Sequence, residues 1–214
     1  MFNRWEDLCN VISLRPLLPA VGLPTPVLPT WCLILYFLDI FHNMDFSIRP
    51  ATLEDCKDIA RMLLELAEYE KVLDQIKVTQ KDLEQDGFIK NPFFHGIVAE
   101  VPEEHRSKEG HTKVGYALYF YSYSSWKGRA VYMEDLYVMP EFRGKGIGKA
   151  LMSKVAQLGL AAGCSLLNFS VLDWNKPSLD FYLSQGCSDI TADMGYHCMR
   201  CEGDELEKLA QGGT

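Results

Sequence analysis

The chain has 214 residues, 48% of them hydrophobic and 23% charged, which is typical of a soluble globular protein and allows one domain with a short appendage. The formal net charge of −8 argues against nucleic acid or an anionic membrane as the main partner, because both attract clustered Lys and Arg. Seven scattered cysteines, an odd number, favour reduced packing thiols in a cytoplasmic protein over a disulfide framework.

Residues 1–43 differ in composition from the rest of the chain. A proline-rich stretch precedes an apolar run at residues 31–41, which is too short to span a bilayer and badly placed for a signal peptide. Regular patterning begins just after Met44. We therefore expect residues 1–43 to be a Pro/Leu-rich extension, poorly ordered or due to an alternative start, and residues 44–214 to form the folded domain. A peripheral membrane anchor is the weaker alternative.

The first half of this domain is predicted to alternate strands and helices. Residues 45–50 are expected to form a strand, and Thr52 to cap a helix whose apolar residues recur at i, i+3, i+4 and i+7. Thr79 and Asp82 make a capping-box pattern, which predicts a short second helix. The apolar run at residues 93–101 predicts a second strand, followed by a polar loop.

The second half begins with two long aromatic-rich strands, at residues 114–124 and 130–140, whose short connection predicts a hairpin. A helix is predicted at about residues 147–162 and a strand at residues 164–172. A further helix is expected to end at Gly186, and two short strands to finish the domain. This order predicts an α/β fold in layers without an internal repeat.

The segment EFRGKGIGKALM, residues 141–152, places three glycines at alternate positions directly before a predicted helix. A Walker A loop would need a hydroxyl where Ala150 stands, and a dinucleotide fingerprint would need glycine in place of Lys149. The segment does match R-x-x-G-x-G between a strand and a helix. Backbone N–H groups at a helix N-terminus bind anions, and glycines let a pyrophosphate approach closely. Alone, the pattern is compatible with either a phosphate site or a simple glycine-rich turn.

This loop resembles motif A of the GNAT superfamily of N-acetyltransferases, in which it holds the pyrophosphate of acetyl-CoA. The segments RPAT, LAEYEK, YMEDLYVMPEFRGKGIG and WNKPSLDFY also resemble the spermidine/spermine (diamine) acetyltransferase family. The resemblance runs from about Ile48 to Leu209. It implies the GNAT fold, a mixed central β-sheet flanked by helices. It further implies acetyl-CoA as cosubstrate, a small-molecule amine as acceptor, and a homodimer.

The resemblance also implies which residues contact acetyl-CoA. The backbone of the strand before the glycine loop is expected to pair with the pantetheine arm, and a backbone N–H there to polarise the acetyl carbonyl. The glycine loop and the helix that starts near Asn175 are expected to contact the rest of the molecule. The implied cofactor-binding residues are Leu136, Tyr137, Val138, Arg143, Gly144, Lys145, Gly146, Ile147, Gly148, Lys149, Asn175, Lys176, Pro177, Ser178 and Gln185.

Two residues are candidates for catalysis. Acetyl transfer requires the amine, protonated at neutral pH, to lose a proton and the departing thiolate to gain one. Glu134 is the candidate for binding the ammonium and relaying its proton through water, and Tyr182 matches the family's general acid. Strand alternation predicts that Glu134 and Asp135 point to opposite faces. The substrate-binding residues that the resemblance implies are Tyr69, Glu70, Glu134, Asp135, Trp126, Asn168, Phe169 and Ser170.

The segment SSWKGR bears on which amine is the substrate. Ser124 and Ser125 stand where the polyamine enzyme of the family carries an acidic residue, and they resemble the family member that acetylates thialysine. Lys127 and Arg129 are then candidates for meeting a substrate carboxylate. We expect a thialysine-like substrate, with spermidine or spermine as the close second candidate. The sequence is also compatible with a protein-lysine acetyltransferase or a non-catalytic binding protein, and its dispersed histidines predict no metal site.

Overall fold

The computed structural model describes residues 45–212, which contain a five-stranded sheet in the order β1-β2-β3-β4-β5. Neighbouring strands are antiparallel from β1 to β4, and β5 is parallel to β4. The predicted extension at residues 1–43 and the boundary at Met44 lie outside the described residues. The strands are β1 (Ser47–Pro50), β2 (His95–Glu100), β3 (Lys113–Ser124), β4 (Gly128–Val138) and β5 (Leu166–Asn168).

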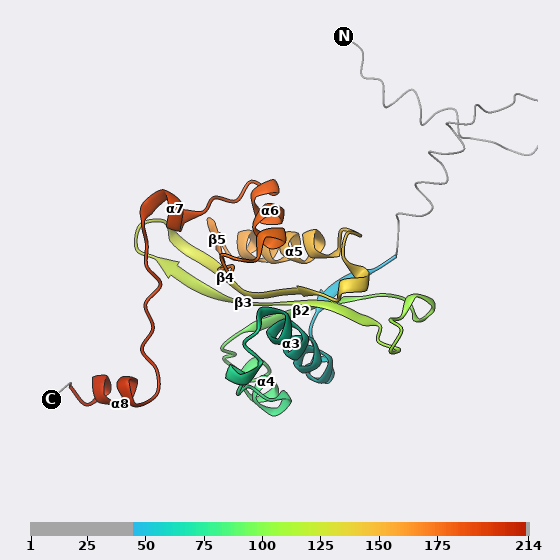
Figure 1. Ribbon diagram of the computed structural model, residues 1–214, viewed down its shortest axis with the longest axis horizontal. Coiled ribbons are helices and arrows are strands. Elements are labelled where there is room, and N and C mark those ends of the chain that lie inside the picture. Colours follow the sequence, from blue (N-terminus) through green and yellow to red (C-terminus); the bar gives the residue numbers. More distant parts are fainter. Residues whose placement is uncertain (1–44, 213–214) are drawn as a thin grey trace, which may run out of the picture. The chain divides into compact units, whose positions relative to one another are not determined.

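Helices cover both faces of the sheet (Figure 1). Helices α3 and α4 lie against one face, and α5 and α6 lie against the other. The mixed α/β architecture predicted from the sequence is therefore confirmed. The helices are α3 (Cys56–Glu70), α4 (Gln80–Gly87), α5 (Ile147–Ala161), α6 (Lys176–Ser184), α7 (Ile190–Met194) and α8 (Asp204–Ala210), with short 3-10 turns η1 (Leu53–Asp55), η2 (Leu73–Gln75), η3 (Glu103–His105) and η4 (Pro140–Phe142).

Local sequence signals account for several element boundaries. The backbone N–H and hydroxyl of Thr79 both donate to Asp82, and the N–H of Asp82 donates back, so the predicted capping box starts α4. Helix α5 begins directly after Gly146, whose φ of 83° ends the preceding loop in a conformation that favours glycine. Lys71 in the left-handed conformation ends α3.

The core fills both sides of the sheet. Helix α3 buries Ile59 and Met62 on one side, and α5 buries Leu151 and Val155 on the other, each at most 1% exposed. Removing this much apolar surface from water is the main stabilising contribution. The packing fixes the N-terminus of α5 and the C-terminus of α3 relative to the sheet between them, and both helix ends contribute to the site described below.

Strands β3 and β4 form the predicted hairpin, with one irregularity in their pairing. Leu118 faces Asp135 and the next residue, Tyr119, faces Met133. Glu134 is therefore an extra residue in β4, a β-bulge. A bulge interrupts the in-and-out alternation of side chains. Both residues line the same cavity, as do all of residues 133–138, and the orientation of their two side chains to opposite faces stays a prediction.

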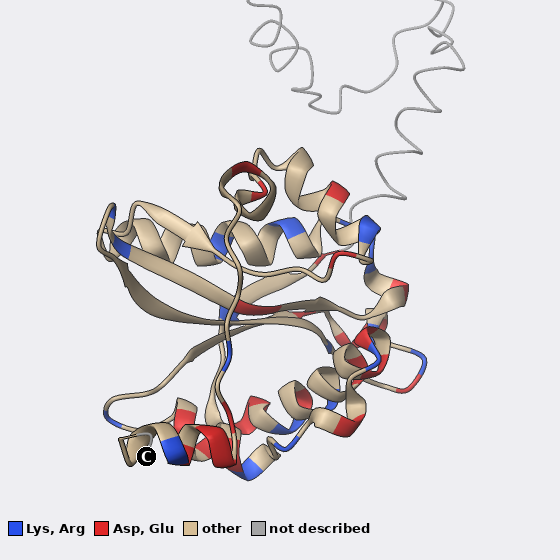
Figure 2. Cartoon of the chain, turned by 60° about the vertical axis from the view of Figure 1, so that its left-hand side comes forward, with Lys and Arg blue, Asp and Glu red and all other residues tan. Residues whose placement is uncertain are grey.

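The C-terminal part departs from the sequence prediction in two ways. The strand predicted at residues 164–172 is limited to β5, which pairs with only three residues of β4. The prediction of two final strands is wrong, because residues 187–212 contain only the short helices α7 and α8 and an extended connection (Figure 1). A strand needs a neighbour to pair with, and in the described part of the chain no strand pairs with residues 195–203. The first turn of α8 is acidic, with Asp204, Glu205 and Glu207, and Lys208 lies in its last turn (Figure 2).

Among the described helices, none is long and apolar enough to cross a membrane. The cysteines within the described range are free thiols. These two observations concern residues 45–212 only.

Candidate active site

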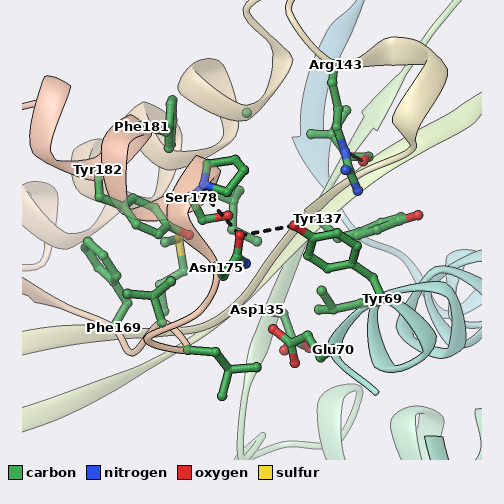
Figure 3. Close-up of a pocket in the computed structure, with 18 of the residues that line it drawn as sticks. Tyr69, Glu70, Asp135, Tyr137, Arg143, Phe169, Asn175, Ser178, Phe181 and Tyr182 are labelled. Carbon is green, nitrogen blue, oxygen red and sulfur yellow. Dashed lines mark hydrogen bonds between the residues drawn. The ribbon is translucent and has the colours of Figure 1, made fainter. Parts of the chain in front are cut away.

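A pocket of about 770 Å³ opens where β4 and β5 diverge. The two strands pair only from Ala130 to Tyr132, after which β4 continues and the chain following β5 turns away. The gap is lined by residues 133–138 on one side and residues 169–172 on the other. The glycine loop, the start of α6 and the end of α3 complete the wall (Figure 3). The pocket is thus lined by segments from most of the domain.

The glycine loop forms one end of this pocket. Gly144 and Gly146 have φ angles of 75° and 83°, which side chains other than glycine rarely adopt. Space around both residues is open, with no protein atom within 4 Å of the position a Cβ would take. Helix α5 begins at the next residue, so its unpaired N–H groups and the positive end of its dipole face this end of the pocket. The loop therefore suits an anion such as a pyrophosphate.

Arg143 and Lys149 add positive charge to the same end. The Nε of Arg143 donates to the carbonyl oxygen of Val138 at 2.9 Å, and the guanidinium stacks over the rings of Tyr69 and Tyr137 at 5.3 and 5.7 Å. These contacts hold the guanidinium beside the cavity, as Figure 3 shows. A planar guanidinium that keeps free N–H groups is suited to phosphate oxygens.

The middle of the pocket is bordered by a strand edge. Residues 133–138 of β4 pair with β3 on one side, and in the described part of the chain no strand pairs with their other side. Their backbone N–H and C=O groups on that side are available to an extended ligand, which could add to the sheet as a strand would. The residues of this stretch were predicted from the resemblance to accept the pantetheine arm.

A hydrogen bond crosses the pocket from α3 to α6. Asn175 caps α6 by accepting from the N–H of Ser178 at 3.4 Å, and its side chain is nearly fully buried. The same oxygen accepts from the hydroxyl of Tyr69 at 3.1 Å (Figure 3). The ring of Tyr69 also packs against Trp174. These contacts fix the start of α6, where Ser178 and Pro177 line the wall.

The opposite end of the pocket is acidic. Glu70 at the end of α3 and the neighbouring residues Glu134 and Asp135 of β4 all line it. Burial raises the pKa of Glu70. Burial also raises the pKa of Asp135 to about 6, with a hydrogen bond from Tyr116 opposing the shift and the charges of Glu134 and Glu70 adding to it. A cation placed among these carboxylates would relieve their mutual repulsion.

Tyr182 lies on the wall formed by α6. Its ring packs against Phe169 at 4.4 Å and Phe181 at 5.2 Å between ring centres, and in Figure 3 its hydroxyl end turns toward the middle of the pocket. Burial raises the pKa of Tyr182 to about 12, with smaller contributions from Cys187 and Glu70. The phenol therefore stays protonated at neutral pH and keeps a proton to donate.

The structure brings most of the predicted site residues to this one pocket. They share a position on its wall: Tyr69, Glu70, Glu134, Asp135, Leu136, Tyr137, Val138, Arg143, Gly144, Gly146, Gly148, Lys149, Phe169, Ser170, Asn175, Pro177, Ser178 and Tyr182. These residues come from five separate segments of the sequence, and the fold brings them together.

Six predicted residues do not line the pocket. Lys145 lies over the ring of Phe142, and Ile147 is buried in the core. Lys176 pairs with Asp180, and Gln185 follows the last turn of α6. Asn168 is the last residue of β5, one position before the lining begins, and Trp126 is 69% exposed at the hairpin turn.

The two basic residues of the hairpin are also away from the pocket wall. Arg129 donates to the carbonyl oxygen of Ala162 at the end of α5, and the carbonyl of Lys127 accepts from Ser165. Neither residue lines the pocket, and their contact with a substrate carboxylate stays a prediction.

Five lining residues were not among the predicted site residues: Leu66, Met133, Val171, Leu172 and Phe181. All are apolar and indistinguishable from core residues in the sequence. Spacing gives a partial signal for two of them, since Leu66 lies one helical turn before Glu70 and Met133 adjoins Glu134. Within residues 45–212, no group of three or more His, Cys, Asp or Glu is arranged to hold a metal ion.

Comparison with known proteins identifies the family. The model of the acetyltransferase (GNAT) family matches residues 59–187. Thialysine N-epsilon-acetyltransferase of Bos taurus is 48% identical over 163 residues, which are 76% of this chain and 96% of that protein. Spermidine/spermine N(1)-acetyltransferase-like protein 1 of Homo sapiens is 37% identical over 169 residues, 78% of this chain but 24% of that protein.

Solved structures agree on the fold. An integron cassette protein from the mobile metagenome of V. cholerae superposes with a TM-score of 0.62 at 27% identity, covering 79% of this chain and all of that one. An aminoglycoside acetyltransferase from an uncultured soil metagenomic sample superposes with a TM-score of 0.58 at 16% identity, covering 74% of this chain and 97% of that one. From the family match, the identities and the sheet with its divergent β4 and β5, the chain belongs to the GNAT family of acetyltransferases, in the group that includes the thialysine and spermidine/spermine acetyltransferases.

Proposed function

We propose that this protein transfers the acetyl group of acetyl-CoA to a primary amine of a small molecule. The observation that carries the proposal is the polarity of the pocket. One end combines a helix N-terminus, open glycines and Arg143, while the other end presents Glu70, Glu134 and Asp135. An anionic cosubstrate and a cationic acceptor would therefore enter from opposite ends and meet beside Tyr182.

The residues present suit acetyl-CoA. The glycine loop at Gly144–Gly148 would hold its pyrophosphate, with Arg143 and Lys149 contacting outer phosphate oxygens. The free edge of β4 at residues 136–138 would pair with the amide groups of its pantetheine arm. When bound, the cosubstrate supplies an activated acetyl thioester. We keep Lys145, Lys176 and Gln185 as proposed contacts of its outer parts, and the backbone N–H of Ile147, at the start of α5, as a proposed contact of its pyrophosphate.

Side chains of the protein would carry out the two proton transfers that the reaction requires. Glu134 and Asp135 would hold the substrate ammonium, and Glu134 would take its proton through water, which frees the nitrogen lone pair. A backbone N–H of β4 would stabilise the negative charge that develops on the acetyl oxygen, a contribution typically worth about 3–4 kcal/mol. Tyr182 would donate its proton to the sulfur as the carbon–sulfur bond breaks, since its raised pKa keeps it protonated.

For the acceptor we propose a thialysine-like amino acid, with spermidine and spermine as the second candidate. Thialysine acetyltransferases of Bos taurus, Sus scrofa and Mus musculus are 47–48% identical to this chain, whereas the spermidine/spermine-like protein is 37% identical. The three carboxylates would also suit a polyamine, which carries several positive charges. Tyr69, Phe169 and Ser170 are proposed to contact the acceptor, with Asn168 and Trp126 at its margin.

The test is kcat/KM for thialysine and spermidine measured side by side with acetyl-CoA. A preference of about 10-fold or more for thialysine would support the first assignment, and the reverse preference would replace it with a polyamine. Absence of turnover with both, in a preparation that binds acetyl-CoA by calorimetry, would overturn the small-molecule assignment. Acetylation of a lysine peptide would then point to a protein substrate.

Three further assignments accompany this function. We propose a homodimer and a cytoplasmic location, the latter supported by the free thiols of the described cysteines. We also propose that the catalytic domain begins near Met44, because the first strand of the sheet, β1, starts at Ser47.

A further inference from the structure

A buried tyrosine lies behind the acidic end of the pocket. Tyr116 on β3 has 0% exposure, and its hydroxyl donates to Oδ2 of Asp135 at 3.2 Å. Its ring packs against Tyr137, which lies opposite it in the β3–β4 pairing. A phenol placed in a core requires a partner for its hydroxyl, because an unpaired buried donor is costly. Here the partner is a carboxylate that lines the pocket, so the bond connects the core with the site.

The other groups that face Asp135 are anionic. Glu134 adjoins it on β4, Glu70 approaches from α3, and both charges act on it. In the described part of the chain, Tyr116 provides the one side-chain hydrogen bond to this carboxylate. Without that bond, the surroundings of Asp135 would favour rotation away from the other carboxylates or uptake of a proton.

We propose that Tyr116 is a positioning residue for the amine substrate: its hydroxyl holds the carboxylate of Asp135 toward the pocket, where that carboxylate receives the substrate ammonium. Tyr116 itself is completely buried and does not line the pocket, so it acts only through Asp135. This inference rests on the proposed function, because it assumes a cationic acceptor at the acidic end.

The titration of Asp135 agrees with the geometry. Burial raises the pKa of Asp135 to about 6, and the hydrogen bond from Tyr116 lowers it from what burial alone would produce. The ionised form, which binds a cation, is therefore present above about pH 6 and is lost as the pH falls through that value. Without the Tyr116 hydroxyl, this loss would occur at a higher pH.

The first experiment compares Tyr116→Phe with the wild-type chain in the pH dependence of kcat/KM for the amine. The acid limb, which reports groups of the free enzyme, is expected to move up by about one pH unit in the variant. At about pH 6.5 the KM for the amine is expected to rise about 3-fold, and about 10-fold at about pH 5 or below, while the KM for acetyl-CoA stays unchanged. Tyr119→Phe is the matched control, since it removes another buried hydroxyl from β3 that does not contact Asp135, and it should leave the limb in place.

Two more variants separate positioning from a general effect on the fold. In an Asp135→Asn background, adding Tyr116→Phe should change neither the acid limb nor the KM any further. Replacing Tyr116 by 3-fluorotyrosine, a stronger donor of nearly the same size, should move the acid limb down, which a loosened core would not do. An unmoved limb in Tyr116→Phe, or an equal shift in the Asp135→Asn background, would overturn the proposal. Absence of amine acetylation by the wild-type chain would instead reject the proposed function itself.

Discussion

Tyr182 combines two properties that identify it as the proposed proton donor. Its pKa is raised by burial to about 12, and its hydroxyl has no side-chain partner within residues 45–212. In Tyr182→Phe we expect kcat to fall about 100-fold, because the departing thiolate loses its donor. Affinity for acetyl-CoA and the melting temperature should stay close to wild type, since the ring and its packing against Phe169 are retained.

Rapid-quench measurement of one turnover, with calorimetric acetyl-CoA binding, checks this expectation. Tyr121→Phe is the control, because Tyr121 is 47% exposed on β3 and outside the pocket. A Tyr182→Phe protein with unchanged single-turnover rate would show that the thiolate leaves without a proton from this residue. The raised pKa also predicts that no basic limb below about pH 10 belongs to Tyr182.

Some features of the site could be predicted from the sequence, and others depend on how the strands pair. Arg143 and the glycines could be predicted because their chemistry is local: a helix N-terminus and a positive φ need only neighbouring residues. The β-bulge at Glu134 could not be predicted, since it is defined by the register of β4 with β3. The sequence likewise gives no sign that Trp126 lies outside the pocket, because that depends on where β4 and β5 separate.

The first turn of α5 supplies a second prediction. Gly148 lines the pocket, and a Cβ added there would meet only the side chain of Val138, at an ordinary 3.8 Å. Gly148→Ala should therefore keep or raise the stability of the free protein by up to about 1 kcal/mol, since alanine favours helices. The added methyl would project where a pyrophosphate approaches the backbone, so acetyl-CoA affinity should fall at least about 10-fold.

Thermal unfolding with and without acetyl-CoA measures both effects at once. Ser153→Ala, on the exposed side of α5, serves as the control, with stability near that of wild type and full affinity. If Gly148→Ala binds acetyl-CoA as tightly as wild type, the pyrophosphate does not lie against this turn. If the free variant is destabilised instead, the helix start is more tightly packed than the structure shows.

A charged network ties α3 to the sheet and gives a prediction on stability. Asp55, 1% exposed, accepts from Arg49 on β1 at 2.7 and 2.9 Å and from the N–H and hydroxyl of Thr52. These bonds outweigh the cost of burial and lower the pKa of Asp55 to about 2 from 3.8. Because the folded-state pKa is lowered, the stabilisation is present above about pH 4 and is lost as the pH falls toward 2.

We expect Asp55→Ala to reduce the free energy of unfolding by about 3 kcal/mol at neutral pH, because it removes a buried carboxylate that bonds to Arg49 and Thr52, although Arg49 keeps its bond to Glu100. Denaturant titrations at about pH 7, 4 and 2.5 check both the size and the convergence of the two proteins at low pH. Asp82→Ala is a matched control, since Asp82 makes the same contacts to Thr79 on the surface, and its effect should be much smaller. Equal losses in both variants would mean that burial of Asp55 is unimportant.

Those helices and strands that depend on short sequence patterns could be predicted from the sequence. The capping box of α4, the β3–β4 hairpin and the bounds of α5 follow from patterns of a few residues. The strand at residues 164–172 was predicted too long, because apolar residues lining a pocket resemble those of a buried strand. The alternating residues after Gly195 also resemble a strand, but in the described chain they lack a neighbour to pair with.

For the molecule as a whole, the C-terminal segment bears on assembly. Residues 188–212 are exposed throughout, including Ile190 at 53%, Met199 at 87% and Leu209 at 64%. Apolar side chains in such numbers on one segment are typical of a surface covered by a partner. Since we propose a homodimer, we expect this segment to lie against the second copy.

Sedimentation velocity should therefore give about twice the chain mass of 24.3 kDa for the full chain. Deleting residues 196–214 should shift the equilibrium to monomers and lower the melting temperature, because the apolar contacts of the segment are lost. Deleting only residues 211–214 is the control and should leave the dimer intact. A full chain that sediments as a monomer at micromolar concentration would refute the homodimer, and a dimer that survives the longer deletion would place the interface elsewhere on the domain.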